Sequence, residues 1–357
     1  MRAVQLVEPT VVRIVDIPVP EIGPEDVLLR VTAAGLCHSD LHVVHNPERI
    51  FAHPVTLGHE VAGSVAAVGA AVRGWTEGAS AIVHLCWSCG SCRNCLAGAD
   101  NVCLRGGRRA QPPAPGLGPD GGMAEFIRVP ARYLVGIDGL DPTVSAPLAD
   151  AAMTAYHAIG NSRGVLAPGA TAVVIGVGGL GHCALQILRA TSAVRIIAID
   201  LDADKLSAAR KHGAHATVPA GAGAGDAVLD MTAGIGAQAV FDFVGNDISV
   251  RTAAACVAPN GVVQISGLAG GRVPLAAEPR DGTGWPWGAS VRTSYGGTRR
   301  DLIECVALAR DGHLSIDVER FSLEDALLAL DRLAAGSVTG RAVLVPGLGN
   351  VSVRKRQ

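Results

Sequence analysis

The stretch TAVVIGVGGLG (171–181) decides the fold of this chain. An apolar run rich in β-branched residues leads into glycines at positions 176, 178 and 181, and apolar side chains then recur at helical spacing as far as Leu188. This order predicts a buried strand, a tight turn and a helix. A second apolar run, VRIIAID (194–200), ends at Asp200, 19 residues after Gly181, and predicts the next strand.

The glycine pattern G-x-G-x-x-G is a weak signal by itself. With a strand before it, a helix after it and an acid at this distance, it becomes a dinucleotide fingerprint. Gly176, Gly178 and Gly181 let the backbone approach a pyrophosphate at the helix N-terminus. Asp200 is expected to accept hydrogen bonds from the adenosine ribose and to repel a 2′-phosphate, which favours NAD over NADP. The alternative is a glycine-rich turn in an α/β domain that binds no nucleotide.

Further apolar runs continue the alternation of strands and helices, at HATVPA (215–220), AVFDFVG (239–245) and GVVQISGL (261–268). This alternation is typical of a doubly wound parallel sheet. AGAGAG (220–225) is predicted to be a flexible surface loop. The N-terminal part instead holds short β runs such as VLLRVTAAG (27–35), with many Pro and Gly residues, and predicts a partly β, barrel-like domain.

Composition limits the class of protein. The chain has 357 residues, which predicts two domains, and its 49% hydrophobic and 17% charged residues suit a buried globular core. The formal net charge of −2 argues against nucleic acid or an anionic membrane as partner. Glu8, Arg13 and Asp16 interrupt the N-terminal segment, so we expect no signal peptide and no membrane span, and hence a cytoplasmic protein.

The segment CWSCGSCRNCLAGADNVC (86–103) holds five of the nine cysteines. In a reducing compartment, such crowding favours a metal over disulfides. The spacing C-x2-C-x2-C-x7-C suits one tetrahedral zinc held by four thiolates in a closed, structural site, with an iron–sulfur cluster or incidental thiols as alternatives. The predicted ligands are Cys89, Cys92, Cys95 and Cys103, and we interpret Cys86 as a bystander.

A second set of candidate ligands is spread along the chain. GLCHSDLH (35–42) contains Cys37, LGHEVAG (57–63) contains His59, and APLADAAMTAYHA (146–158) contains Asp150. One cysteine, one histidine and one carboxylate would leave the fourth tetrahedral position of a zinc open, as in catalytic sites. Spacing alone gives only weak support, because each residue could equally be an ordinary core or surface group.

The chain resembles the zinc-dependent alcohol dehydrogenases of the medium-chain dehydrogenase/reductase superfamily, and most closely their bacterial NAD-dependent secondary-alcohol branch. The motifs that carry the resemblance follow the expected order along nearly the whole chain: GLCHSD (35–40), TLGHE (56–60), the four-cysteine segment, PLADAAMTAYHA (147–158), VVIGVGGLGH (173–182), FDFVG (241–245) and GSVTGRAVLVP (336–346). The resemblance implies a GroES-like catalytic domain over 1–151 that resumes at 295–357, an NAD-binding Rossmann domain over 152–294, two zincs per chain and a homo-oligomer.

The resemblance also implies a role for individual residues. Cys37, His59 and Asp150 match the catalytic zinc ligands; many relatives have a second cysteine in place of Asp150. The implied chemistry is hydride transfer between an alcohol and NAD, with the alcohol proton leaving through Ser39 and the cofactor ribose towards His42. The remaining matches are Asp40 and Glu60 beside the zinc, and His38, Thr154, Lys205 and Arg341 as cofactor contacts.

Aromatic and apolar residues suggest the substrate class. They could line a pocket for hydrophobic or aryl secondary alcohols, or equally belong to the core or a subunit interface, and they are Phe51, Leu85, Trp87, Leu117, Trp285 and Tyr295. Three other functions remain as alternatives. A polyol or primary-alcohol dehydrogenase would share the fold, and a zinc-free quinone or enoyl reductase would lack the catalytic ligands. A cysteine-rich module that binds nucleic acid would have no use for the dinucleotide fingerprint.

Overall fold

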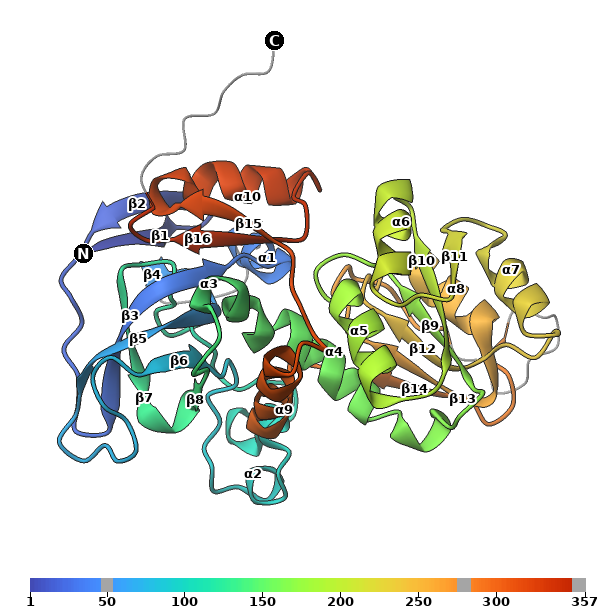
Figure 1. The fold of residues 1–357 in the computed structure, drawn as a ribbon, viewed down its shortest axis with the longest axis horizontal. Coiled ribbons are helices and arrows are strands. Elements are labelled where there is room, and N and C mark those ends of the chain that lie inside the picture. The colour runs from blue at the N-terminus through green and yellow to red at the C-terminus, as the bar shows by residue number, and fades with distance from the viewer. Residues whose placement is uncertain (46–53, 275–283, 349–357) are drawn as a thin grey trace, which may run out of the picture. The chain divides into compact units, whose positions relative to one another are not determined.

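The computed structural model describes residues 1–45, 54–274 and 284–348, and Figure 1 shows the ribbon. The chain forms two compact units, one of residues 1–150 and 297–357 and the other of residues 151–296. The boundaries expected from the sequence, 151/152 and 294/295, lie one and two residues away from these. Within the described residues, no helix has both the length and the apolar character that crossing a membrane requires.

The second unit is built on a six-stranded parallel sheet with the order β11-β10-β9-β12-β13-β14. Its strands are β9 (Thr171–Ile175), β10 (Arg195–Asp200), β11 (Ala216–Pro219), β12 (Ala237–Asp242), β13 (Val257–Ile265) and β14 (Ser290–Thr293). Its helices are α4 (Ala151–Gly160), α5 (Gly181–Thr191), α6 (Ala203–Lys211), α7 (Ala224–Met231) and α8 (Asp247–Cys256), with a 3-10 turn at Arg163–Val165. The strand order confirms the predicted doubly wound sheet.

Strand β9 is buried at every position, as its unbroken apolar sequence predicts for a central strand of a parallel sheet. The glycine turn follows it, and Gly176 has a positive φ of 82°, which favours glycine. The prediction of a flexible loop at 220–225 is wrong in part, because Ala224 and Gly225 begin α7 and are buried. A Cβ on Gly225 would lie 2.6 Å from the Ala255 Cβ, so close helix packing explains this glycine.

The first unit contains a seven-stranded sheet and a three-stranded one. The larger has the order β15-β16-β3-β5-β6-β8 with β7 paired to β3, and the smaller has the order β2-β1-β4. The strands are β1 (Arg2–Glu8), β2 (Val11–Asp16), β3 (Asp26–Gly35), β4 (Val55–Thr56), β5 (Glu60–Val68), β6 (Ser80–Val83), β7 (Phe126–Pro130), β8 (Leu134–Gly136), β15 (Val318–Ser322) and β16 (Arg341–Val345).

Helices complete the first unit. They are α1 (His38–His45), α2 (Arg93–Leu96), α3 (Pro142–Ser145), α9 (Arg299–Arg310) and α10 (Ala326–Ala334), with 3-10 turns at Asp100–Val102, Leu104–Gly106, Ala131–Tyr133, Ala146–Ala149 and Leu323–Asp325. One apolar core, which includes Leu29, Leu57 and Leu134, joins the sheets to α1 and α10. The predicted β-rich character of this part is confirmed.

Candidate active site

Three elements of the first unit bring the dispersed candidate ligands together. Cys37 lies between β3 and α1, His59 immediately precedes β5, and Asp150 follows the 3-10 turn at Ala146–Ala149. The ligand atoms of these residues all lie within 4.8 Å of one another. Asp150 Oδ2 is 3.3 Å from Cys37 Sγ and 3.6 Å from His59 Nε2. The structure thus assembles a set that spacing alone supported only weakly.

The three donors fit a tetrahedral zinc ion. With ordinary zinc–ligand bond lengths, two ligand atoms of such an ion lie about 3.3–3.5 Å apart for a nitrogen–oxygen pair and about 3.5–3.7 Å apart for a sulfur–oxygen pair. The separations given above are within a few tenths of an ångström of these values. Cys37 and His59 are buried and Asp150 is half-buried. Three ligands of mixed type would leave one tetrahedral position for a small oxygen ligand.

Asp40 connects two of these ligands. Its carboxylate is fully buried, and Oδ2 accepts a 2.8 Å hydrogen bond from the backbone N–H of Cys37. Asp40 Oδ1 lies 3.4 Å from His59 Nδ1, the ring nitrogen away from Asp150. Burial alone would lower the pKa of His59, but the carboxylates of Asp40 and Asp150 outweigh it and raise that pKa well above its ordinary value. Asp40 is therefore placed where outer carboxylates orient a ligand imidazole in metal sites, although Asp40 Oδ1 and His59 Nδ1 do not form a hydrogen bond in the structure.

Arg341 and Glu60 form a buried ion pair next to Asp150. Arg341 Nε donates a 3.0 Å hydrogen bond to Glu60 Oε2, and Arg341 Nη2 donates to Glu60 Oε1 and lies 3.4 Å from Asp150 Oδ2. Burial disfavours the charged guanidinium, but Glu60 raises the pKa of Arg341 well above its ordinary value. Gly35 makes room for the pair, since a Cβ there would lie 2.0 Å from Glu60 Oε2.

The residues expected to move protons lie on α1. Ser39 Oγ is 3.7 Å from Cys37 Sγ, in the first turn of the helix. His42 follows three residues later, about one turn further along, and is half-buried. His38 is exposed at the start of the helix. The structure therefore places Ser39 beside the ligand cluster and His42 on the same helix.

The four-cysteine segment folds around its own thiols. The Sγ atoms of Cys92 and Cys95 are 3.4 Å apart, and those of the pairs Cys89–Cys95 and Cys92–Cys103 are 3.9 Å apart. A tetrahedral zinc with four sulfur ligands needs about 3.8 Å between sulfurs, whereas a disulfide needs about 2.05 Å. All nine cysteines lie within the described residues, and none of them forms a disulfide. The arrangement fits a metal and contradicts disulfide pairing.

Backbone donors surround these sulfurs. The N–H of Cys92 points at Cys89 Sγ (3.3 Å), and the N–H of Leu104 points at Cys92 Sγ (3.4 Å). Hydrogen bonds from Ser91 lower the pKa of Cys89 to about 5, and burial raises that of Cys95 to about 11. Cys86 lies outside the set and is fully buried, and this burial raises its pKa.

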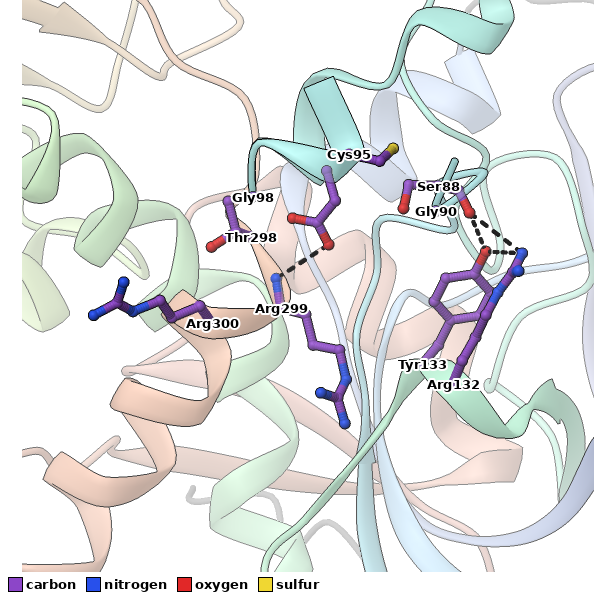
Figure 2. A pocket seen from close by; sticks show the side chains of 10 residues that line it. Ser88, Gly90, Cys95, Gly98, Arg132, Tyr133, Thr298, Arg299 and Arg300 are labelled. Atoms are coloured by element: carbon purple, nitrogen blue, oxygen red, sulfur yellow. Dashed lines mark hydrogen bonds between the residues drawn. The ribbon is translucent and has the colours of Figure 1, made fainter. Parts of the chain in front are cut away.

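A cavity of about 280 Å³ adjoins this four-cysteine segment, and Figure 2 shows it. Tyr133 and Arg132 both donate to the carbonyl of Ser88 on one side, and the N–H of Arg299 points at Asp100. The lining residues are Ser88, Gly90, Cys95, Gly98, Asp100, Arg132, Tyr133, Thr298, Arg299 and Arg300. Among the described residues, none of those predicted for the substrate pocket lines this cavity.

The dinucleotide turn has the expected geometry within the second unit. A Cβ on Gly181 would lie 2.0 Å from the carbonyl oxygen of Gly176, so the helix can begin here only with glycine. Asp200 ends β10, and its carboxylate accepts hydrogen bonds from the N–H groups of Val177 (2.7 Å) and Asp202 (3.0 Å). The acid is thereby fixed beside the turn. Gly178 lies within the turn, Thr154 is buried in α4, and Lys205 is half-buried on α6.

The structure shows how most of the residues predicted for the substrate pocket are packed, and their role in a pocket stays a prediction. Trp285 belongs to the core of the second unit, where its indole N–H donates to the Pro274 carbonyl. Leu85 is buried, and Trp87 and Leu117 pack against the core of the first unit, as the alternative interpretation of these residues held. Tyr295 is half-buried. Phe51 lies outside the described residues.

Sequence reasoning missed two buried charged side chains, one in each unit. It assigned Arg341 to the cofactor and did not foresee its contacts with Glu60 and Asp150, and that cofactor contact stays a prediction. It also gave no role to Asp242, a fully buried acid at the end of β12. The signal for the first was Gly35, paired with Glu60 in the β3–β5 ladder. The signal for the second was an acid inside an otherwise apolar strand sequence.

Comparison with known proteins shows which family the chain resembles. Residues 23–139 match the alcohol dehydrogenase GroES-like domain, and residues 179–311 match the zinc-binding dehydrogenase family. An NAD-dependent alcohol dehydrogenase of Sulfolobus acidocaldarius is 32% identical over 93% of this chain and 95% of its own length. D-arabinose 1-dehydrogenase (NADP(+)) of Saccharolobus solfataricus is 31% identical over 93% of each chain.

Among solved structures, the alcohol dehydrogenase of the hyperthermophilic archaeon Aeropyrum pernix is similar. It superposes with a TM-score of 0.89 at 34% identity, covering 97% of this chain and 100% of that one. These matches confirm the predicted GroES-like and Rossmann-like domains. Together with the ligand clusters, they establish that the chain belongs to the zinc-dependent alcohol dehydrogenases of the medium-chain dehydrogenase/reductase superfamily.

Proposed function

We propose that this oxidoreductase interconverts hydrophobic or aryl secondary alcohols and their ketones, uses NAD, and holds two zincs per chain. The observation that carries the proposal is the cluster of Cys37, His59 and Asp150, whose separations suit a zinc with one free position. A closed four-thiolate site would serve stability only. Family membership favours a homo-oligomer, which light scattering on the purified protein would measure.

The first unit supplies the catalytic residues. Cys37, His59 and Asp150 would hold the catalytic zinc, and Cys89, Cys92, Cys95 and Cys103 the structural one. When bound, the catalytic zinc polarises the alcohol oxygen and makes its proton more acidic, and the nicotinamide accepts the hydride. Asp40 keeps the imidazole of His59 oriented, and Arg341 compensates the negative charge of Glu60 and Asp150.

Ser39 would accept the alcohol proton, because its hydroxyl lies beside Cys37 at the start of α1. His42 would take up that proton at the end of the relay. A hydroxyl can receive and donate a proton at once, and an imidazole can exchange one with water near neutral pH. This division of roles explains why both residues lie on the helix that begins directly after a ligand.

Asp200 supports NAD as the cofactor. The Val177 and Asp202 N–H groups hold its carboxylate at the end of β10, where a ribose hydroxyl can donate to it. A 2′-phosphate at that position would meet a fixed negative charge. The relative named for D-arabinose and NADP makes this choice the point to test, together with the polyol class of substrate.

The deciding experiment is a panel of primary, secondary, aryl and polyol alcohols, each assayed with NAD and NADP by the near-ultraviolet absorbance of the reduced cofactor. We expect the highest kcat/KM with aryl or other apolar secondary alcohols and NAD. Asp200→Ser should shift preference towards NADP, whereas Asp204→Ala removes an exposed carboxylate four residues away and should not. A wild type that prefers NADP or a polyol would contradict the corresponding part of the proposal.

A further inference from the structure

The FDFVG motif contains an acid for which the proposed chemistry has no use. Asp242 is the last residue of β12 and its side chain is fully buried. We infer that Asp242 is a positioning residue for the nicotinamide dinucleotide, which holds the loop 242–246 against the glycine turn after β9. The inference rests on the cofactor site proposed above and adds a residue to it.

The carboxylate of Asp242 organises the loop that follows it. Oδ1 accepts hydrogen bonds from the N–H groups of Val244 and Gly245, each 2.9 Å long. Oδ2 accepts a 2.7 Å hydrogen bond from the Ser249 hydroxyl. Burial raises the pKa of Asp242 above its ordinary value. The three hydrogen bonds oppose this increase without cancelling it. Two backbone donors on one oxygen fix the direction in which the chain leaves the sheet.

Ser249 extends this arrangement to the next helix. Its hydroxyl oxygen accepts a 3.0 Å hydrogen bond from the N–H of Asn246, while the Asn246 side chain accepts from the N–H groups of Ile248 and Ser249. This is a reciprocal cap at the start of α8. The acid therefore links the end of β12 to the start of α8, and the intervening loop has little freedom to shift.

The loop in turn contacts the glycine turn. A Cβ on Gly176 would lie 2.6 Å from Val244 Cγ2, so the first glycine of the fingerprint packs directly under Val244. The N–H of Phe243 also donates to the carbonyl of Ile175, the last residue of β9. Gly181 then packs on the carbonyl of Gly176. A displacement of Val244 would release the turn at the point from which α5 begins.

The loop also supports the segment after β13. A Cβ on Gly245 would lie 2.1 Å from the carbonyl oxygen of Gly267, and the N–H of Gly271 donates to the Gly245 carbonyl. Three successive loops, those after β9, β12 and β13, are thus in backbone contact at one edge of the sheet. Dinucleotides bind at the carboxyl ends of parallel strands, which is this edge. Asp242 is the one buried carboxylate that ties these loops together within the described residues.

The test measures NADH binding directly, by fluorescence titration in the absence of alcohol. Asp242→Asn keeps the size of the side chain, but its amide group would face the Ser249 hydroxyl as a donor where the carboxylate accepts. We expect the Kd for NADH to rise about three- to tenfold, the loss of one or two hydrogen bonds expressed as affinity. KM for NAD should rise with it, and kcat should change less.

Two further variants keep the test decisive if Asp242→Asn folds poorly. Ser249→Ala removes one donor to the carboxylate, and Val244→Ala removes the contact with Gly176, so both should weaken NADH binding. Asp230→Asn changes an exposed carboxylate on α7 and serves as the control. A lower melting temperature with unchanged NADH affinity in all three variants would make Asp242 merely structural and overturn the inference. A wild type that binds neither NADH nor NADPH would overturn the cofactor site itself, and this inference with it.

Discussion

The two metal-ligand clusters of the first unit are built in opposite ways. The four thiols come from a stretch of 15 residues, 89–103, that contains only short helical turns, and three of the four cysteines are half-exposed. The three mixed donors come from positions as far as 113 residues apart, and two of them are buried beside the large sheet. One site depends on a local loop and the other on the whole domain around it.

This difference matches the two tasks of a bound metal. A local loop of thiols would depend on the ion for its stability, since metal binding would supply part of its folding free energy. A cluster held by strands and by Asp40 has its shape from the protein, so a zinc bound there would be held without any change in the fold. The comparison therefore predicts that damage to one site should affect stability and damage to the other should affect turnover.

The largest effect is expected for His59→Ala. Loss of the nitrogen ligand should remove one zinc per chain and lower kcat/KM for alcohol oxidation by about 10³-fold or more, because metal polarisation contributes several kcal/mol to the transition state. Metal analysis and steady-state rates provide the measurement. The exposed His313→Ala is the control and should behave as wild type. If the rates of His59→Ala were within tenfold of wild type, the cluster that contains His59 would not be the one that turnover requires.

Cys92→Ser tests the four-cysteine segment, whose metal is expected to contribute to stability. It should also remove one zinc per chain, but its main effect should be a melting temperature lower by roughly 5–10 °C, with turnover largely kept at low temperature. Cys86→Ala changes a buried thiol outside the set and should leave the metal content unchanged. Full zinc content and unchanged melting in Cys92→Ser would refute the structural site.

Asp40→Asn sharpens the account of how the protein shapes the catalytic cluster. The amide can still accept from the N–H of Cys37, but it no longer presents a negative charge to His59. Zinc affinity should fall about 10–100-fold, as is typical when an outer carboxylate is lost. Competition with a chelator measures this affinity. Asp138→Asn removes an exposed carboxylate of the same unit and provides the control; equal affinities in both variants would exclude the role given to Asp40.

The smallest effect is expected for His42→Ala. Oxidation should slow by at most about 10²-fold at neutral pH and recover as pH rises, because hydroxide then replaces the relay. Rates measured against pH with one secondary alcohol decide the matter. Parallel profiles for mutant and wild type would remove His42 from the relay and leave Ser39 to pass its proton to water through the cofactor ribose.

The two clusters also differ in how far sequence could predict them. The spacing of the cysteines was enough to predict that four thiols gather at one place, because 15 consecutive residues contain all four. The glycine turn and Asp200 were equally readable, since a strand, a turn and a helix are local features. The prediction that three distant residues form one ligand cluster was supported mainly by the family resemblance. No local pattern shows that Cys37, His59 and Asp150 lie close together.

What sequence reasoning missed depends on tertiary contact. The pairing of Arg341 with Glu60 requires β16 and β5 to flank β3, a register that no single segment reveals. For Trp285 the sequence left a pocket and a core position open, because an aromatic side chain suits both equally well. Its packing in the core of the second unit and its bond to the Pro274 carbonyl favour the core position. The early start of α7 was missed because a run of Ala and Gly residues is typical of flexible loops. Only the packing of Gly225 against Ala255 of α8 shows why these small residues begin a helix.

Asp40 contacts both the backbone of Cys37 and the ring of His59 through interactions that involve no ion. The three donor side chains are therefore already held together by the folded chain. Most of the entropic cost of gathering them is met when the chain folds. A rigid chelate selects ions by bond length and coordination number instead of adapting to each one. Another tetrahedral cation such as cobalt would therefore take the place of the proposed zinc without rearrangement of the polypeptide, while larger ions that prefer six ligands would be rejected.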